Sequence, residues 1–250
     1  MGVHELKMKD MLAELQGFYD EKGISSTDFR CKHHAECRND NEQFTEAKAA
    51  LVGREYQTHK LPRLLFISLD SGSGNAAINN TITAVEEAYY RSNTNRAKNR
   101  HWYRTHEIAC EILKEFDSNI TIESVKGWFA HTNSAKCCMN KTGRRKADKI
   151  LFKNCMEFVS EEVSILNPDI IITQGNEAHY SLKNKFPKLE NVANVFQNDL
   201  SEVSVIVINN HPVLWIRTYH PGNWGKFNKV TRKSLPAYAK ISHEFIKATN

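Results

Sequence analysis

The sequence predicts an α/β fold of three layers, in which a mainly parallel central sheet lies between two layers of helices. Short apolar runs typical of buried strands alternate along the chain with longer stretches of helical periodicity. Small or polar residues follow several of these runs directly, as residues 68–75 follow the run 64–67. The composition is that of an ordinary globular protein, with 40% hydrophobic and 25% charged residues in a chain of 250.

Local patterns predict the elements in order. An amphipathic helix over residues 5–21 opens the chain and ends at Gly23. Apolar runs predict strands at 64–67, 125–132, 169–173, 203–208 and 213–218. Spaced apolar residues predict helices at 78–91, 101–116, 144–166, 176–185 and 232–248. Because no repeat or low-complexity linker interrupts this order, we expect one domain over residues 1–250, with residues 1–60 packed on it.

Several classes of protein are excluded at this stage. The longest apolar stretches, such as 64–67 and 170–172, are far too short to span a bilayer. The first residues lack the apolar core of a secretory signal. We therefore expect a cytoplasmic protein with no membrane partner, and a monomer as the simplest state. In that reducing compartment the six cysteines are not expected to form disulfides.

The net charge of +5 is concentrated in three basic segments, at 91–104, 136–149 and 226–233. Trp102 and Trp224 lie in or beside two of them. Basic stretches with neighbouring aromatic rings are typical of proteins that bind a polyanion with stackable bases. The alternative is that these charges belong to solvated helix faces and loops.

The cysteines predict a metal site. Cys31 and Cys37 lie in one polar segment, while Cys137, Cys138 and Cys155 lie more than a hundred residues later. Two distant groups of thiols indicate a zinc or iron–sulfur site that closes a long loop. His33 and His34 lie between the first two cysteines and could serve as zinc ligands, so zinc stays an alternative to an iron–sulfur site. Cys110 is expected to be a buried hydrophobic residue on a helix.

Four residues follow or end the predicted strands: Asp70, Asn133, Gly175 and His220. The carboxyl ends of parallel strands meet at one edge of a sheet, which is where α/β proteins bind ligands. Each residue has an ordinary alternative as a helix cap or turn former. Their common placement nevertheless predicts one site.

The order of these motifs resembles the uracil-DNA glycosylase superfamily, and most closely its iron–sulfur branch. The matching segments are 65–72, 132–137, Cys155 on the following helix, 167–178 and 219–222. The resemblance covers roughly residues 30–248. It implies a DNA glycosylase that hydrolyses the N-glycosidic bond of a flipped uracil or modified pyrimidine and leaves an abasic site.

The resemblance also implies residue roles. Asp70 orients water below the sugar, His220 stabilises the departing base, and Asn133 reads the base edge. Contacts to substrate or DNA are implied for Gly72, Ser73, Asn75, Lys136, Asn176, Asn223, Trp224 and Lys226. A [4Fe–4S] cluster is implied on Cys31, Cys37, Cys137 and Cys155, with Cys138 competing with Cys137 for one position.

The sequence departs from that pattern in ways that affect the substrate. Asp70 is an acid that the iron–sulfur branch lacks at this position, and small residues 73–77 replace its base-stacking aromatic segment. Together with the basic insertion 92–100, this predicts room for a larger base. One alternative is therefore a phage-defence glycosylase for glucosylated hydroxymethylcytosine. Two alternatives of other classes are a nucleic-acid-binding iron–sulfur protein without turnover and a zinc-binding module.

Overall fold

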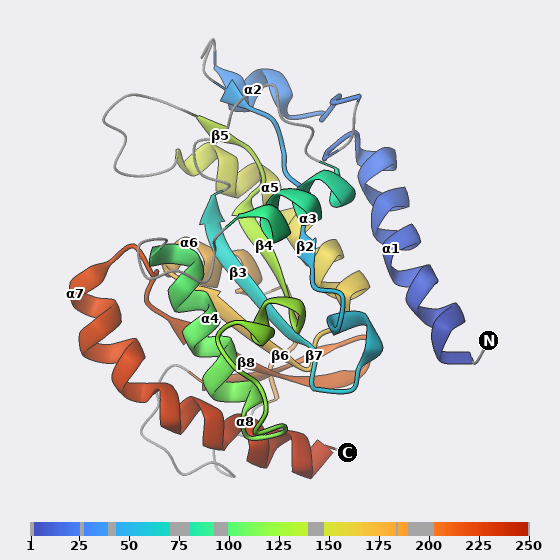
Figure 1. Ribbon diagram of the computed structural model, residues 1–250. Coiled ribbons are helices and arrows are strands. Elements are labelled where there is room, and N and C mark those ends of the chain that lie inside the picture. The colour runs from blue at the N-terminus through green and yellow to red at the C-terminus, as the bar shows by residue number, and fades with distance from the viewer. Residues whose placement is uncertain are drawn as a thin grey trace.

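A six-stranded sheet forms the centre of the computed structural model (Figure 1). The structure describes residues 3–25, 28–39, 44–70, 81–92, 100–139, 148–183, 185–189 and 203–249. The strands are β1 Phe44–Thr45, β2 Leu51–Val52, β3 Leu64–Asp70, β4 Phe129–Ala135, β5 Cys138–Met139, β6 Ile170–Gln174, β7 Val203–Ile208 and β8 His211–Thr218. The strand order is β2-β4-β3-β6-β8-β7, and the four central strands are parallel. The edge strands β2 and β7 are antiparallel to their neighbours, while β1 and β5 form a separate pair.

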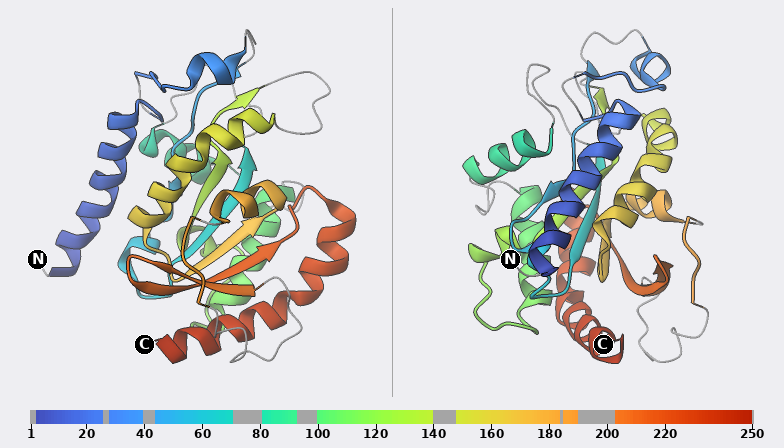
Figure 2. Two further views of the ribbon diagram at one scale, coloured as in Figure 1. Left: turned by 180° about the vertical axis from the view of Figure 1, so that it is seen from behind. Right: turned by 90° about the vertical axis from the view of Figure 1, so that its right-hand side faces the viewer.

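Helices cover both faces of this sheet (Figure 2). They are α1 Val3–Lys22, α2 His34–Arg38, α3 Ile82–Arg91, α4 Arg100–Leu113, α5 Lys149–Leu166, α6 Asn176–Leu182, α7 Trp224–Lys226 and α8 Leu235–Thr249. Helices α4 and α8 pack on one face around Phe66 and Ile172, and α1, α5 and α6 pack on the other around Leu65 and Ile171. The predicted three-layer α/β/α fold with a mainly parallel sheet is therefore confirmed. None of the helices in these ranges combines the length and apolar character needed to cross a membrane.

Double coverage explains the composition of the central strands. Residues 64–67 of β3 and 170–172 of β6 are completely buried, so both faces of each strand need apolar side chains. This is why these strands read as continuous apolar runs in the sequence. In β3 and β6, polar residues enter only toward the carboxyl end of the strand.

Several predicted boundaries were wrong. Strands β3 and β4 run on to Asp70 and Ala135 instead of ending at 67 and 132, and helices α4 and α6 end at Leu113 and Leu182 instead of 116 and 185. The strand expected from residue 125 begins at Phe129, because Ser124–Gly127 form a 3-10 turn. The last helix begins at Leu235, because a π-turn at Phe227–Thr231 and a 3-10 turn at Arg232–Ser234 precede it. Part of the helix expected at 144–166 lies outside the described residues, which resume at 148.

The strand order creates a switch point between β3 and β6. From β3 the chain continues to β4 on one side, and from β6 it continues to β7 and β8 on the other. Helices after such adjacent strands leave in opposite directions, which opens a crevice at the carboxyl edge of the sheet. The candidate site residues lie at this edge.

Candidate functional site

Side chains from β3 and β4 share one face at the carboxyl edge of the sheet. Ser68 and Asn133 are paired across the parallel ladder, so they lie on the same face. Asp70 and His131 lie two residues from them along the same strands and therefore also share that face. Helix α4 covers this face and adds His101, while His220 follows β8. We call this group the strand-end cluster: Ser68, Asp70, His101, His131, Asn133 and His220.

Hydrogen bonds fix the centre of the cluster. The Ser68 hydroxyl donates to Oε1 of Gln174, 2.5 Å away. Because a serine has a single hydroxyl proton, Nε2–H of His131 must be the donor in the 2.9 Å contact with the same oxygen. Gln174 in turn donates to Thr105 of α4 at 3.0 Å. The chain of contacts therefore connects β4, β3, β6 and α4 behind the site.

His220 has a defined tautomer. Its Nδ1 accepts a hydrogen bond from the backbone N–H of Gly222 at 3.1 Å, so in the neutral ring the proton is on Nε2. Burial lowers the pKa of His220 to about 4, so the ring is neutral near pH 7. A neutral imidazole with Nε2–H is a hydrogen-bond donor suited to an oxygen that becomes negative during a reaction.

The two other histidines of the cluster are also held neutral. Burial, followed by the nearby Lys136 and His220, lowers the pKa of His131 to about 3. Burial and the neighbouring His131 and His220 lower the pKa of His101 well below its ordinary value. The site therefore offers polar ring nitrogens without positive charge.

Gly175 brings the ends of three strands together. It follows β6 with a φ of +102°, a conformation that favours glycine. A Cβ at this position would lie 3.1 Å from Cδ2 of Leu69 and 3.3 Å from Cβ of His220. Because Leu69 precedes Asp70, this close approach places the end of β3 beside His220.

Asp70 lies where the cluster meets the segment after β4. Its Oδ2 accepts a hydrogen bond from the Cys138 thiol, with the sulfur 3.5 Å away. Burial raises the pKa of Cys138 to about 11, so the thiol keeps its proton and acts as the donor. The prediction left Cys137 and Cys138 in competition for a metal. In the structure Cys138 faces Asp70.

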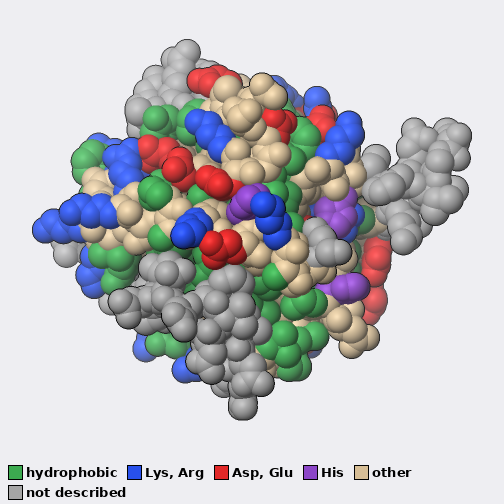
Figure 3. All heavy atoms as spheres, turned by 90° about the horizontal axis from the view of Figure 1, so that it is seen from below, with side chains coloured by type: hydrophobic (Ala, Val, Ile, Leu, Met, Phe, Trp, Pro, Cys, Tyr) green, Lys and Arg blue, Asp and Glu red, His purple; other side chains and the backbone are tan. Residues whose placement is uncertain are grey.

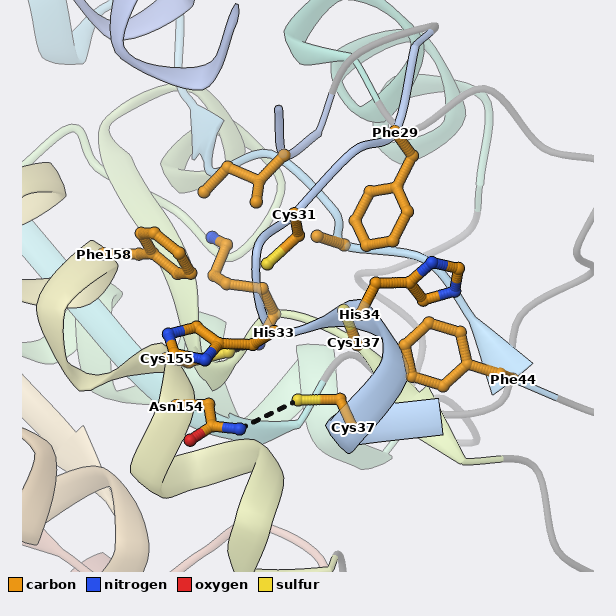
Figure 4. A pocket seen from close by; sticks show the side chains of 13 residues that line it. Phe29, Cys31, His33, His34, Cys37, Phe44, Cys137, Asn154, Cys155 and Phe158 are labelled. Carbon is orange, nitrogen blue, oxygen red and sulfur yellow. Dashed lines mark hydrogen bonds between the residues drawn. The ribbon is translucent and has the colours of Figure 1, made fainter. Parts of the chain in front are cut away.

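The other four predicted ligands lie around one cavity, the cysteine pocket, defined by Cys31, Cys37, Cys137 and Cys155 (Figure 4). Cys31 precedes α2, Cys37 lies in α2, Cys137 lies between β4 and β5, and Cys155 lies in α5. The remaining walls are largely apolar and include Phe29, Phe44 and Phe158, together with the rings of His33 and His34. All six cysteines of the chain are free thiols.

Hydrogen-bond donors approach the sulfur atoms of this pocket. The backbone N–H of Lys136 donates to Sγ of Cys155 at 3.3 Å, and Nδ2 of Asn154 donates to Sγ of Cys37 at 3.4 Å. Burial, followed by the neighbouring cysteines, raises the pKa of Cys137 well above its usual value. Three of these thiols are buried and that of Cys31 is half-buried, and as thiolates the four would repel one another. With N–H donors on two of them, they form a donor set that suits a cationic iron–sulfur core. Within the described ranges, no three Cys, His, Asp or Glu side chains form a group that could hold a metal ion as they stand.

The prediction that Lys136 contacts DNA was wrong. Its side chain is 1% exposed, and its Nζ lies 2.6 Å from Oε1 of the fully buried Glu162. The ammonium group also donates to Thr132 at 2.8 Å, and the Tyr19 hydroxyl donates to the same Glu162 oxygen at 2.5 Å. Lys136 therefore joins β4, α5 and α1 inside the protein, because an unpaired buried carboxylate would be unfavourable.

Two basic side chains of the predicted segment 91–104 lie against the ring of Trp224. The guanidinium of Arg100 lies 4.3 Å from the Trp224 ring centre, and that of Arg104 lies 4.8 Å from it. Arg104 also donates to the carbonyl of Pro221, the residue after His220. Trp224 remains 49% exposed, and we call Arg100, Arg104 and Trp224 the tryptophan ridge. On the face seen in Figure 3, acidic and basic side chains of the described residues are instead interspersed.

The remaining predicted contacts lie at the surface or outside the described residues. Asn223 and Lys226 are exposed beside Trp224, and Asn223 Oδ1 accepts from the backbone N–H of Lys226. Asn176 is exposed, and its Oδ1 accepts from Arg217 at 2.8 Å. Gly72, Ser73 and Asn75 lie outside the described residues.

Sequence reasoning missed Ser68, His101 and His131. Ser68 was considered only as part of a loop, and His131 was hidden inside a strand. The alternation of side chains along β4 could have identified His131, since it lies two residues before Asn133. No local signal brought His101 to this site, because its position depends on how α4 packs on the sheet.

Comparisons with known proteins do not assign a family or a function to this site. No family model matches the chain, and no curated protein has a significantly similar sequence.

Proposed function

We propose that the protein is a DNA glycosylase that removes a flipped pyrimidine base by hydrolysis. The observation that carries the proposal is the strand-end cluster, where an acid, an amide and a neutral imidazole come from three strands to one edge of the sheet. Each group has a distinct role in this reaction. The resemblance of the motif order to uracil-DNA glycosylases supports the same assignment.

The chemistry requires two kinds of charge stabilisation. When the bond between the sugar C1′ and the base nitrogen breaks, the base takes the electron pair and the sugar becomes positive. Nε2–H of His220 donates to the base oxygen that becomes negative, and the Asp70 carboxylate stabilises the sugar and orients the attacking water. The water oxygen bonds to C1′, and its proton leaves through Asp70. The Asn133 amide offers a donor and an acceptor to the base edge.

The tryptophan ridge supports DNA as the partner. The exposed Arg100 can neutralise a phosphate, and the exposed Trp224 ring, with the buried Arg104 beside it, offers a surface on which a base can stack. Because Arg104 binds the carbonyl next to His220, this surface adjoins the proposed site of chemistry. DNA held there would present a flipped base to the strand-end cluster.

We further propose that the cysteine pocket holds a [4Fe–4S] cluster through Cys31, Cys37, Cys137 and Cys155. When bound, such a cluster supplies a structural clamp, because its four ligands come from segments far apart in the chain. The thiols would have to be kept reduced, so we expect the protein to work in the cytoplasm. A monomer is the simplest oligomeric state for this function. Iron and sulfide analysis with visible absorbance tests this assignment, and zinc in their place would support the zinc alternative.

The decisive experiment measures base release from DNA duplexes that each carry one base: uracil, hydroxymethylcytosine or its glucosylated form. Asp70→Asn is expected to abolish release and to leave DNA binding largely intact. Asp20→Asn is the matched control, because Asp20 is exposed on α1 and its carboxylate accepts a hydrogen bond from Gln16 of the same helix. Full turnover by Asp70→Asn would refute the role of Asp70.

The same panel separates the substrate alternatives. Release of glucosylated hydroxymethylcytosine, with little release of uracil, would identify a defence enzyme for bulky bases. Release of uracil alone would remove that alternative. DNA binding without release of any base would identify a nucleic-acid-binding protein without turnover.

A further inference from the structure

His101 makes contacts that the proposed reaction does not use directly. It lies in the first turn of α4, and its ring centre is 5.2 Å from that of His220, with the two planes tilted by 33°. No other aromatic ring in the described part of the chain packs against His220. The ring of His101 therefore covers one side of the imidazole that the proposed function depends on.

His101 is itself fixed by its surroundings. The edge of its ring meets His131 at 5.7 Å and Trp102 at 5.7 Å between centres. Its Nε2 lies 3.5 Å from the Ser68 hydroxyl, at the outer limit of a hydrogen bond. The ring thus has contacts on several sides besides His220, and it cannot turn freely.

The same turn of α4 holds the His220 loop at a second point. Arg104 lies three residues after His101, so both side chains project from one face of the helix. Its guanidinium donates to the carbonyl of Pro221, while the backbone of Gly222 binds Nδ1 of His220. The ring of His220 is therefore held by α4 from the side and by its own loop at Nδ1.

We infer that His101 is a positioning residue that holds the His220 imidazole with Nε2–H directed at the departing base. This inference rests on the proposed function, and it assigns His101 no contact with substrate. Ring packing carries the effect, so the nitrogen atoms of His101 are not required. The titratable groups that face His220 are His101 from α4 and His131 from β4, with Arg104 beside its loop.

The test compares His101→Ala, which removes the ring, with His101→Phe, which keeps a ring of similar shape. Nitrogen NMR on the full chain reports the tautomer and titration of His220. Without the His101 ring beside it, the His220 ring can turn away from the N–H of Gly222, so we expect His101→Ala to mix the tautomers and to move the titration of His220 toward that of a free histidine. Single-turnover base release should slow by about tenfold to a hundredfold. His101→Phe should restore the tautomer and release bases within about threefold of the unaltered protein.

His243→Ala is the matched control. His243 lies on α8 and packs against Phe116, so its substitution should leave His220 unchanged. If His101→Ala does not fold, His101→Gln carries the same expectation. An unchanged His220 spectrum in His101→Ala would overturn the inference even if bases are released. Equal losses in His101→Phe and His101→Ala would also overturn it, since a ring nitrogen would then be required. If no base is ever released, the proposed function fails while the NMR comparison still decides the role of His101.

Discussion

Removing the positive charge at Lys136 should strongly destabilise the fold. Glu162 is 0% exposed and binds Lys136, Tyr19 and Thr132, so Lys136→Met leaves a buried carboxylate with two neutral donors and no cation. Breaking a buried ion pair in this way costs about 3–5 kcal/mol. That is a large part of the free energy of unfolding of a typical domain, which is about 5–15 kcal/mol.

The measurement is urea unfolding followed by circular dichroism, with thermal melting as a second readout. For a chain of this size the expected loss corresponds to a Tm about 6–20 °C lower. The double variant Lys136→Met, Glu162→Gln removes the buried charge and should recover most of the loss. Lys185→Met, at an exposed position, should change the free energy of unfolding by no more than about 0.5 kcal/mol. A single variant as stable as the parent, or a double variant no better than the single one, would refute this reasoning.

Three further outcomes are expected. Trp224→Ala should weaken DNA binding by roughly fivefold to a hundredfold, since stacking of one base contributes about 1–3 kcal/mol; an unchanged Kd in a fluorescence titration would exclude the ridge from the interface. Cys37→Ser should lower the iron content of purified protein while Cys110→Ser, outside the pocket, should not, and equal iron in both would contradict the ligand assignment. The free energy of unfolding should fall as pH is lowered from about 6.5 toward 4. In this range His220 binds a proton in the unfolded chain but not in the folded state, where its pKa is about 4. A His220→Asn variant should therefore lose less stability in acid unfolding curves.

The sequence predicted the layers well because burial on both faces imposes a pattern that is visible locally. The runs 64–67 and 170–172 are apolar throughout, and both proved to be central strands. Their neighbour β4 begins four residues later than predicted, because the buried apolar Val125 belongs to a 3-10 turn at 124–127 and not to the strand.

The site was only partly predictable, since it depends on contacts between distant elements. Asp70 and His220 could be placed by their position at strand ends. The burial of Lys136 could not, because a lysine beside cysteines in a basic segment reads as a surface residue until Glu162 and Tyr19 are known to face it. His101 was missed for the same reason.

Three consecutive residues after β4 serve three separate parts of the molecule. Lys136 is bonded to the buried Glu162, Cys137 lines the cysteine pocket, and Cys138 donates to Asp70. Deleting or inserting a single residue in this tripeptide would therefore displace these side chains from their partners, because the three are consecutive along the main chain. The buried ion pair, the wall of the cysteine pocket and the contact to Asp70 are thus linked through one short stretch of main chain, so a change in its length would disturb all three.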